Sequence, residues 1–181
     1  MTSVLVIAGW VLVPGECRAE AKCPWLNAAT AAGLLGGEVQ MTVTAPVEPD
    51  AGKGVGTAMY PDQVRMDRFD VSCDFSRKVD SSVYTLGIVV KTMSDPAKEF
   101  ASFLKLCGGT TVALQGIGNE AVQCTAKDDS GPGHEQVIAR VRDRAFVLTV
   151  NRELSPHPTA NGDELRDDTR NIAEQVAGSL F

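Results

Sequence analysis

Three segments of the chain repeat their apolar residues at the spacing of an α-helix. The first follows Asn27, a good N-cap residue, and the second follows Asp95 as N-cap, with Pro96 at its first helical position. A glycine pair ends each of these two segments, and the third begins near Asp163 and continues to the C-terminus. The pattern therefore predicts three helices. Their apolar stripes are Ala31, Leu34 and Leu35; Phe100, Phe103, Leu104 and Cys107; and Leu165, Ile172, Val176 and Leu180.

Most of the remaining sequence has the character of β-strands. Apolar and polar residues alternate over residues 39–45 and 69–75, so each of these segments has one apolar and one polar face. Residues 84–92 are apolar on both faces, which predicts a strand in the interior of a sheet. The last two of six predicted strands join in a hairpin around Arg142-Asp143-Arg144. These two hairpin strands are residues 137–141 and 146–150, and residues 122–126 form the remaining predicted strand.

This order of elements, α-β-β-β-α-β-β-β-α, indicates the α+β fold class. We expect a two-layer sandwich in which an about six-stranded, mainly antiparallel sheet is covered on one face by the three helices. A chain of 181 residues suits one domain, and we place that domain at residues 22–181.

The N-terminal segment is typical of a secretory signal peptide. An apolar run over residues 4–13 is broken by Pro14-Gly15 and is followed by the small-x-small pattern Ala19-Glu20-Ala21. Cleavage after this pattern would remove residues 1–21 and make Lys22 the mature N-terminus. The apolar run is about half as long as the roughly 20 residues that a membrane-spanning helix requires, so the sequence predicts no membrane span.

Two alternatives to this prediction stay open. Met1-Thr2-Ser3 lacks the basic residues of a normal signal peptide, so the apolar run could instead be an N-terminal buried strand. Cys17 could carry a lipid, although Glu16 immediately before it fits a lipoprotein site poorly.

Cysteine number and position predict two disulfides and an extracytoplasmic (periplasmic or secreted) protein. Cleavage after residue 21 would leave four cysteines, which permit three pairings. Cys107 ends the second helix on its apolar face, and Cys124 lies on the inward face of the next strand, so we pair these two. Cys23 is then paired with Cys73. No Cys-x-x-Cys spacing is present, so we assign no metal ligands.

The charge of the chain restricts its partners. The net charge is −6, whereas nucleic acids and anionic membrane surfaces select basic patches, so we expect no nucleic-acid partner. The one local basic cluster comprises Arg140 and Arg142 on one strand, Arg144 at the turn and Arg152 beyond the next strand. It is either a solvated sheet face paired with acidic residues or a surface that binds a small anionic ligand or a protein partner.

Other polar segments do not match a catalytic, metal-binding or cofactor-binding motif, so we assign no catalytic residues and no cofactor. Residues 52–57 are rich in glycine but lack the Gly-Lys-Ser/Thr ending and the following helix of a phosphate-binding loop. Residues 128–134 contain Asp128, Asp129 and His134 without the spacing of a calcium loop, and His157 lies between two prolines. These segments are predicted to be connecting loops.

Three short motifs resemble a family of extracytoplasmic proteins of unknown function, best known among actinobacterial lipoproteins. They are a cysteine before a short helix that ends in Leu-Leu-x-Gly (residues 23–37), a cysteine on a strand (Cys73) and the turn Gly116-Ile117-Gly118-Asn119-Glu120-Ala121. The chain differs from the family in lacking a lipobox and in having Asn119 where Asp is usual. The resemblance implies an extracytoplasmic location but no activity.

We therefore expect a secreted or periplasmic binding or accessory domain without catalytic activity. Its contact surfaces would be the sheet face that the helices leave open and the loop over residues 46–61. One alternative is an extracytoplasmic hydrolase that uses paired carboxylates, and another is a structural or envelope-assembly role.

Overall fold

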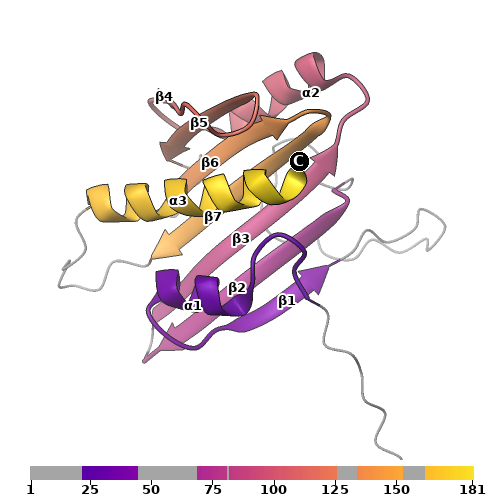
Figure 1. Cartoon of the computed structure of the whole chain (residues 1–181). Coiled ribbons are helices and arrows are strands. Elements are labelled where there is room, and N and C mark those ends of the chain that lie inside the picture. The colour runs from indigo at the N-terminus through magenta and orange to yellow at the C-terminus, as the bar shows by residue number, and fades with distance from the viewer. Residues whose placement is uncertain (1–21, 45–68, 81, 126–133, 153–161) are drawn as a thin grey trace, which may run out of the picture.

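The computed structural model describes residues 22–44, 69–80, 82–125, 134–152 and 162–181. Within these residues the chain forms three α-helices and a seven-stranded antiparallel sheet, so the predicted α+β class is confirmed (Figure 1). The extra strand, β4, is two residues long, too short to give an alternating pattern. In chain order the elements are α1 (Ala28–Leu35), β1 (Gln40–Thr44), β2 (Val71–Val79), β3 (Ser82–Thr92), α2 (Pro96–Phe103), the short 3-10 helix η1 (Leu104–Leu106), β4 (Val112–Ala113), β5 (Glu120–Thr125), β6 (His134–Val141), β7 (Arg144–Arg152) and α3 (Gly162–Leu180).

The strands lie in the order β1-β2-β3-β7-β6-β5-β4, and every neighbouring pair is antiparallel. The centre of the sheet joins β3 to β7, two strands that are far apart in the sequence. The segment predicted to be interior because it is apolar on both faces is β3, which has a partner on each side. The predicted hairpin forms between β6 and β7, with Val141 opposite Arg144.

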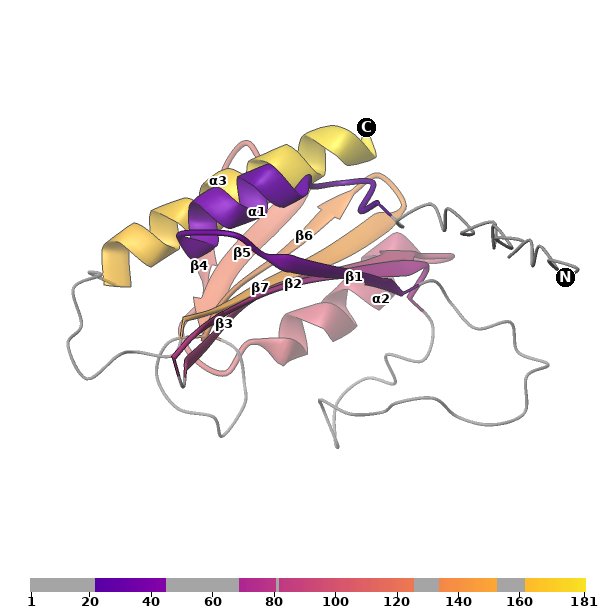
Figure 2. The same ribbon diagram turned by 90° about the horizontal axis from the view of Figure 1, so that it is seen from below.

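The helices lie on both faces of the sheet, which corrects the expectation of two layers. Figure 2 shows α1 and α3 on one face and α2 on the other. The physical reason lies in β6 and β7, where Ile138, Ala145 and Val147 are apolar on the face opposite α3. Because apolar side chains on a second face also need cover, α2 packs against these two strands.

The larger core lies between the sheet and the α1/α3 layer. Period-2 alternation brings one face of five strands into it, and the apolar stripes of α1 and α3 cover that face. Its strand residues are Cys73 and Phe75 from β2; Leu86, Ile88 and Val90 from β3; Ala121 from β5; Val137, Ala139 and Val141 from β6; and Phe146, Leu148 and Val150 from β7.

Local signals at the ends of α1 are confirmed. The side chain of Asn27 accepts a hydrogen bond from the Thr30 amide at 2.8 Å, and Gly36 ends the helix with a φ of 78°. The guanidinium of Arg77 on β2 donates to the Leu35 carbonyl at 2.7 Å, which satisfies one of the free carbonyls at the helix end. A Cβ at Gly37 would lie 2.8 Å from Arg77 Nε, so this glycine makes room for the contact.

Both predicted cysteine pairs lie at bonding distance, one on each side of the sheet. Cys23 and Cys73 are 5.8 Å apart between their Cα atoms, and Cys107 and Cys124 are 5.6 Å apart. The first pair ties the segment before α1 to β2, and the second ties the end of η1 to β5. Two disulfides in one chain are typical of proteins from an oxidising environment outside the cytoplasm.

Candidate functional site

The face of the sheet that carries α2 has two rows of polar residues beyond the helix. The strand register defines both rows, each of which crosses β1, β2, β3, β7 and β6. None of their positions has an apolar side chain, and none of them belongs to the apolar cluster that α2 covers. We call these ten residues the polar strip. They are Thr42, Asp74, Gly87, Thr149 and Gln136 in one row, and Gln40, Ser76, Thr85, Asn151 and His134 in the next.

Exposure along the first row of the polar strip decreases from the β1 edge toward β6. Thr42 on β1 is exposed, Thr149 on β7 is half-buried, and Gln136 on β6 is 3% exposed. Gln136 Nε2 donates to Thr149 Oγ1 at 3.2 Å, whereas Gln136 Oε1 is buried and has no hydrogen-bond partner. Buried polar atoms are hydrogen-bonded in most proteins, so the free Oε1 marks a position where the fold has not satisfied an acceptor.

Asp74 is the carboxyl group of the polar strip. It lies between Thr42 and Gly87 in the register, and the Ser72 hydroxyl donates to its Oδ2 at 3.4 Å. Although part of the side chain is exposed, desolvation by the surrounding protein raises its pKa above the usual 3.8, and the hydrogen bond from Ser72 opposes that rise.

Gly87 lies at the centre of the polar strip, between Asp74 and Thr149. Its φ is not in the left-handed region, and among the described residues a Cβ built on it would meet only Asp74 Oδ1, at the ordinary contact distance of 3.4 Å. The fold therefore does not require glycine here, and glycine inside a strand weakens it. A strand glycine without a structural reason is typical of a place where another molecule approaches the backbone closely.

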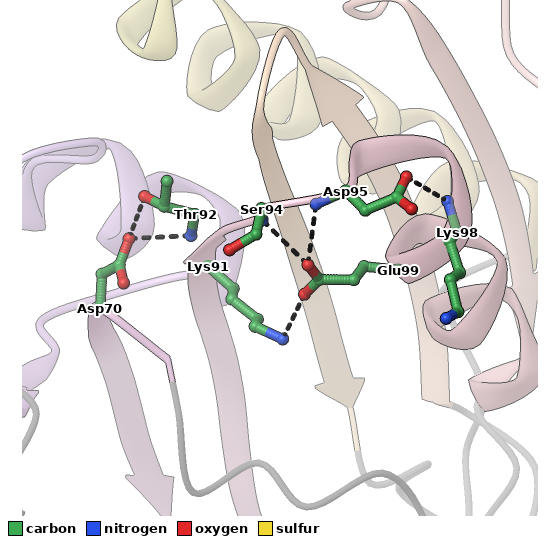
Figure 3. Close-up of polar contacts among 7 residues, drawn as sticks. All are labelled: Asp70, Lys91, Thr92, Ser94, Asp95, Lys98 and Glu99. Atoms are coloured by element: carbon green, nitrogen blue, oxygen red, sulfur yellow. Dashed lines mark hydrogen bonds and ion pairs between the residues drawn. The ribbon is translucent and has the colours of Figure 1, made fainter.

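A network of polar contacts fastens the start of α2 to the end of β3 (Figure 3). The side chain of Asp95 caps the helix by accepting from the Lys98 amide at 3.3 Å. Glu99 Oε1 accepts from the Ser94 amide at 2.9 Å and from the Asp95 amide at 3.1 Å, and its Oε2 pairs with Lys91 at 2.8 Å.

These contacts lower the pKa of Glu99 to about 2, and the hydrogen bond from Lys91 is the largest cause. On the other side of β3, Asp70 accepts from both the amide and the hydroxyl of Thr92. All of these groups are satisfied by one another, so the network holds α2 in place and offers no free chemistry.

The predicted arginine cluster is divided along β7. Arg142 and Arg144 lie at the hairpin, whereas Arg152 lies at the other end of the nine-residue strand, opposite Tyr84. Arg140 Nε pairs with Glu120 at 2.6 Å. Arg142 donates to the Phe181 main-chain oxygen at 2.9 Å, and its guanidinium lies 5.6 Å from the Phe181 ring. The side chains of Arg140 and Arg142 are therefore engaged within the fold.

The turn that carries the family resemblance docks on the same hairpin. Gly116 and Gly118 have φ values of 86° and 59°, and a Cβ at Gly118 would lie 2.3 Å from the Arg140 carbonyl oxygen. The Asn119 amide donates to that oxygen at 2.8 Å, and its Oδ1 accepts from the Arg142 amide at 2.6 Å. Asn119 is thus a structural residue of the turn, and an aspartate there could accept the same hydrogen bond.

A second carboxyl group with a raised pKa is Glu135, on the α3 face. Desolvation raises its pKa, and Arg166 on α3, 3.5 Å from Oε1, opposes the rise. Asp74 lies on the opposite face of the sheet, so these two carboxyl groups cannot form the catalytic pair that the hydrolase alternative needs.

Other predicted features lie partly or wholly outside the described residues. These are the signal segment with Cys17, the loops over residues 46–61 and 128–133, and His157; His134 is described and belongs to the polar strip. In the described part of the chain, no cluster of His, Cys, Asp and Glu could hold a metal ion. No helix there combines the length and the hydropathy of a membrane span.

The sequence pattern predicts the polar face of two strands but does not predict the polar strip. The alternation over residues 39–45 and 69–75 already assigned Thr42 and Asp74 to a polar face. The strip also depends on β3 lying beside β7, a pairing that no local pattern predicts. The chain matches no protein-family model, and comparison with curated proteins and with solved structures gave no match either.

Proposed function

We propose that the chain is an exported, non-catalytic binding domain that contacts a partner protein through the polar strip. The glycine at the centre of the strip carries this proposal, because Gly87 weakens β3 while the fold leaves room for a side chain there. A row of hydroxyl and amide groups along the face of a sheet suits a polar protein surface better than a small molecule, which binds in concave sites.

The chemistry of the polar strip suggests what the partner offers. The Asp74 carboxylate and the Thr42 hydroxyl are acceptors on the exposed part of the strip, so the partner would present N–H or O–H donors there. A small anionic ligand suits the strip poorly because Asp74 is acidic. The arginine cluster also gives little support to an anionic ligand, since Arg140 pairs with Glu120 and Arg142 donates to the Phe181 main-chain oxygen.

Export of the mature domain from Lys22 is part of this proposal. The two cysteine pairs at bonding distance support it, because such pairs persist outside the cytoplasm. Membership of the extracytoplasmic family that the chain resembles is proposed on the same basis. N-terminal sequencing of the protein from its exporting host tests this part, and a start at Lys22 is the expected result.

Site-specific photo-crosslinking tests the polar strip as the binding surface. A photoreactive phenylalanine analogue replaces Thr85, which lies between Ser76 and Asn151 in the strip, and a second variant carries it at Glu174 on the exposed side of α3. After irradiation in the exporting host, the Thr85 variant should give adducts of discrete mass that the Glu174 variant does not give.

Gly87→Val provides the matched test of the central observation. Valine favours strands, and the space above Gly87 accommodates a Cβ, so this variant should unfold at the same temperature as the parent or higher. Combined with the analogue at Thr85, it should abolish the adducts. Equal adducts from the Thr85 and Glu174 variants, or unchanged adducts in Gly87→Val, would contradict the proposal.

A further inference from the structure

The two edges of the sheet differ in how they are protected. β4 is an edge of two residues, and very short edge strands offer little to an incoming strand. β1 is an edge of five residues, Gln-Met-Thr-Val-Thr, with no charge, no proline and a regular register against β2. Among the described residues, no hydrogen bond other than those to β2 involves the β1 backbone. The residues of β1 themselves therefore carry none of the charges, prolines or bulges with which natural edge strands prevent strand addition.

We infer that the β1 edge pairs with the β1 edge of a second copy of this chain. Antiparallel pairing about Thr42 brings Met41 of each copy opposite Val43 of the other, and Gln40 opposite Thr44. Met41 and Val43 lie half-buried at the margin of the α1/α3 core, so the pairing covers apolar surface on that face. The polar positions meet on the other face, and no like charges oppose each other. The strand is thus complementary to itself, as a two-fold interface requires.

Such a dimer would make one sheet from two and join the polar strips of both copies. Thr42 is the outermost residue of its row, so the row would continue across the two-fold axis on the same face. A contact based on five residues is smaller than the roughly 1,200 Å² of total buried surface typical of stable complexes. The dimer should therefore dissociate on dilution.

Sedimentation equilibrium of the disulfide-intact chain over a wide concentration range tests this inference. The parent should show a reversible monomer–dimer equilibrium. Thr42→Lys and Thr42→Glu should each be monomeric at concentrations where the parent is dimeric, because like charges would meet at the axis. An equimolar mixture of the two variants should associate again. The matched control Val112→Lys, at the exposed edge strand β4, should dimerise like the parent.

Thermal unfolding shows whether each Thr42 variant is folded. If a variant is unfolded, amide hydrogen exchange of residues 40–44 in the parent still tests the inference. Protection of the parent amides should rise with protein concentration. A parent that is monomeric at every concentration overturns the inference. So does a dimer that survives in Thr42→Lys or dissociates in Val112→Lys. Full protection at every concentration would also overturn it, because the edge would then be occupied within one chain.

Discussion

The face of the sheet that carries α2 has two halves of opposite character. Near the hairpin end of β6 and β7, Ile138, Ala145 and Val147 are buried under Phe100 and Phe103 of α2. Toward the other end of the same strands the polar strip begins, and none of its residues belongs to the apolar cluster under α2. Along each strand, the change from apolar to polar side chains occurs between one residue and the next on the same face, two positions apart in the sequence.

This difference suggests that one half of the face stabilises the fold and the other half binds a partner. The α2 half buries apolar area and is expected to carry free energy of unfolding. The polar strip buries little apolar area and contains a glycine that weakens β3, so substitutions there should change contacts with a partner more than the fold.

Truncation of an aromatic residue under α2 should have the largest effect. Phe103 is 4% exposed, and Phe103→Ala should lower the free energy of unfolding by about 3–5 kcal/mol because it leaves a cavity beside Val147 and Ile138. Ser76→Ala in the polar strip should change it by no more than about 0.5 kcal/mol. Urea unfolding of both variants measures the difference. Similar losses would mean that the polar strip is structurally as important as the α2 half.

Loss of the disulfides should rank next. The Cys23–Cys73 bond spans 50 residues and the Cys107–Cys124 bond spans 17, so chain entropy predicts losses of about 4 and about 3 kcal/mol. Paired Cys→Ser variants measured by urea unfolding test this order. The Cys107–Cys124 variant should also expose the Phe103 ring, because that bond fastens the end of the α2–η1 segment. A reversed order would show that anchoring the α2 layer matters more than loop length.

The sequence predicted the elements well because their signals are local. Asn27, Asp95 and Pro96 mark helix starts by capping chemistry, and the cysteine pairing followed from the faces on which Cys107 and Cys124 lie. The layers could not be predicted in this way, since a strand that is apolar on both faces does not indicate which helix covers which face. The polar strip depends on five strands meeting in register. The polar residues of single strands could be predicted from the sequence, but the pairing that places them in one row could not.

Gly118→Ala and Gly87→Ala test the different roles of two glycines. At Gly118 the φ of 59° disfavours alanine, and the new Cβ would lie 2.3 Å from the Arg140 carbonyl oxygen, so this variant should lose about 1–3 kcal/mol. At Gly87 in the polar strip the new Cβ would make an ordinary 3.4 Å contact with Asp74 Oδ1, and alanine should be neutral or add up to about 1 kcal/mol. Thermal unfolding of the two variants gives the comparison. A loss at Gly87 as large as that at Gly118 would remove the reason to regard this glycine as functional.

Two carboxyl groups should respond to pH with opposite sign, and these effects are the smallest. The folded pKa of Glu99 is about 2, below the usual 4.5, so its contribution to stability is present above pH 4.5 and is lost as pH falls toward about 2. The folded pKa of Asp74 is raised above 3.8, so ionisation opposes folding once pH rises through that pKa.

At neutral pH, Glu99→Gln should therefore lower the unfolding temperature and Asp74→Asn should raise it. Both differences should shrink in acid. The effect of Asp74→Asn should shrink as pH falls below 3.8, and that of Glu99→Gln as pH approaches about 2. Thermal unfolding from pH 2 to 7, with NMR titration of both carboxyl groups, measures this. Same-sign shifts would mean that Asp74 is held by contacts as satisfied as those of Glu99. The polar strip would then be part of the scaffold, and its acidic group would not be reserved for a partner.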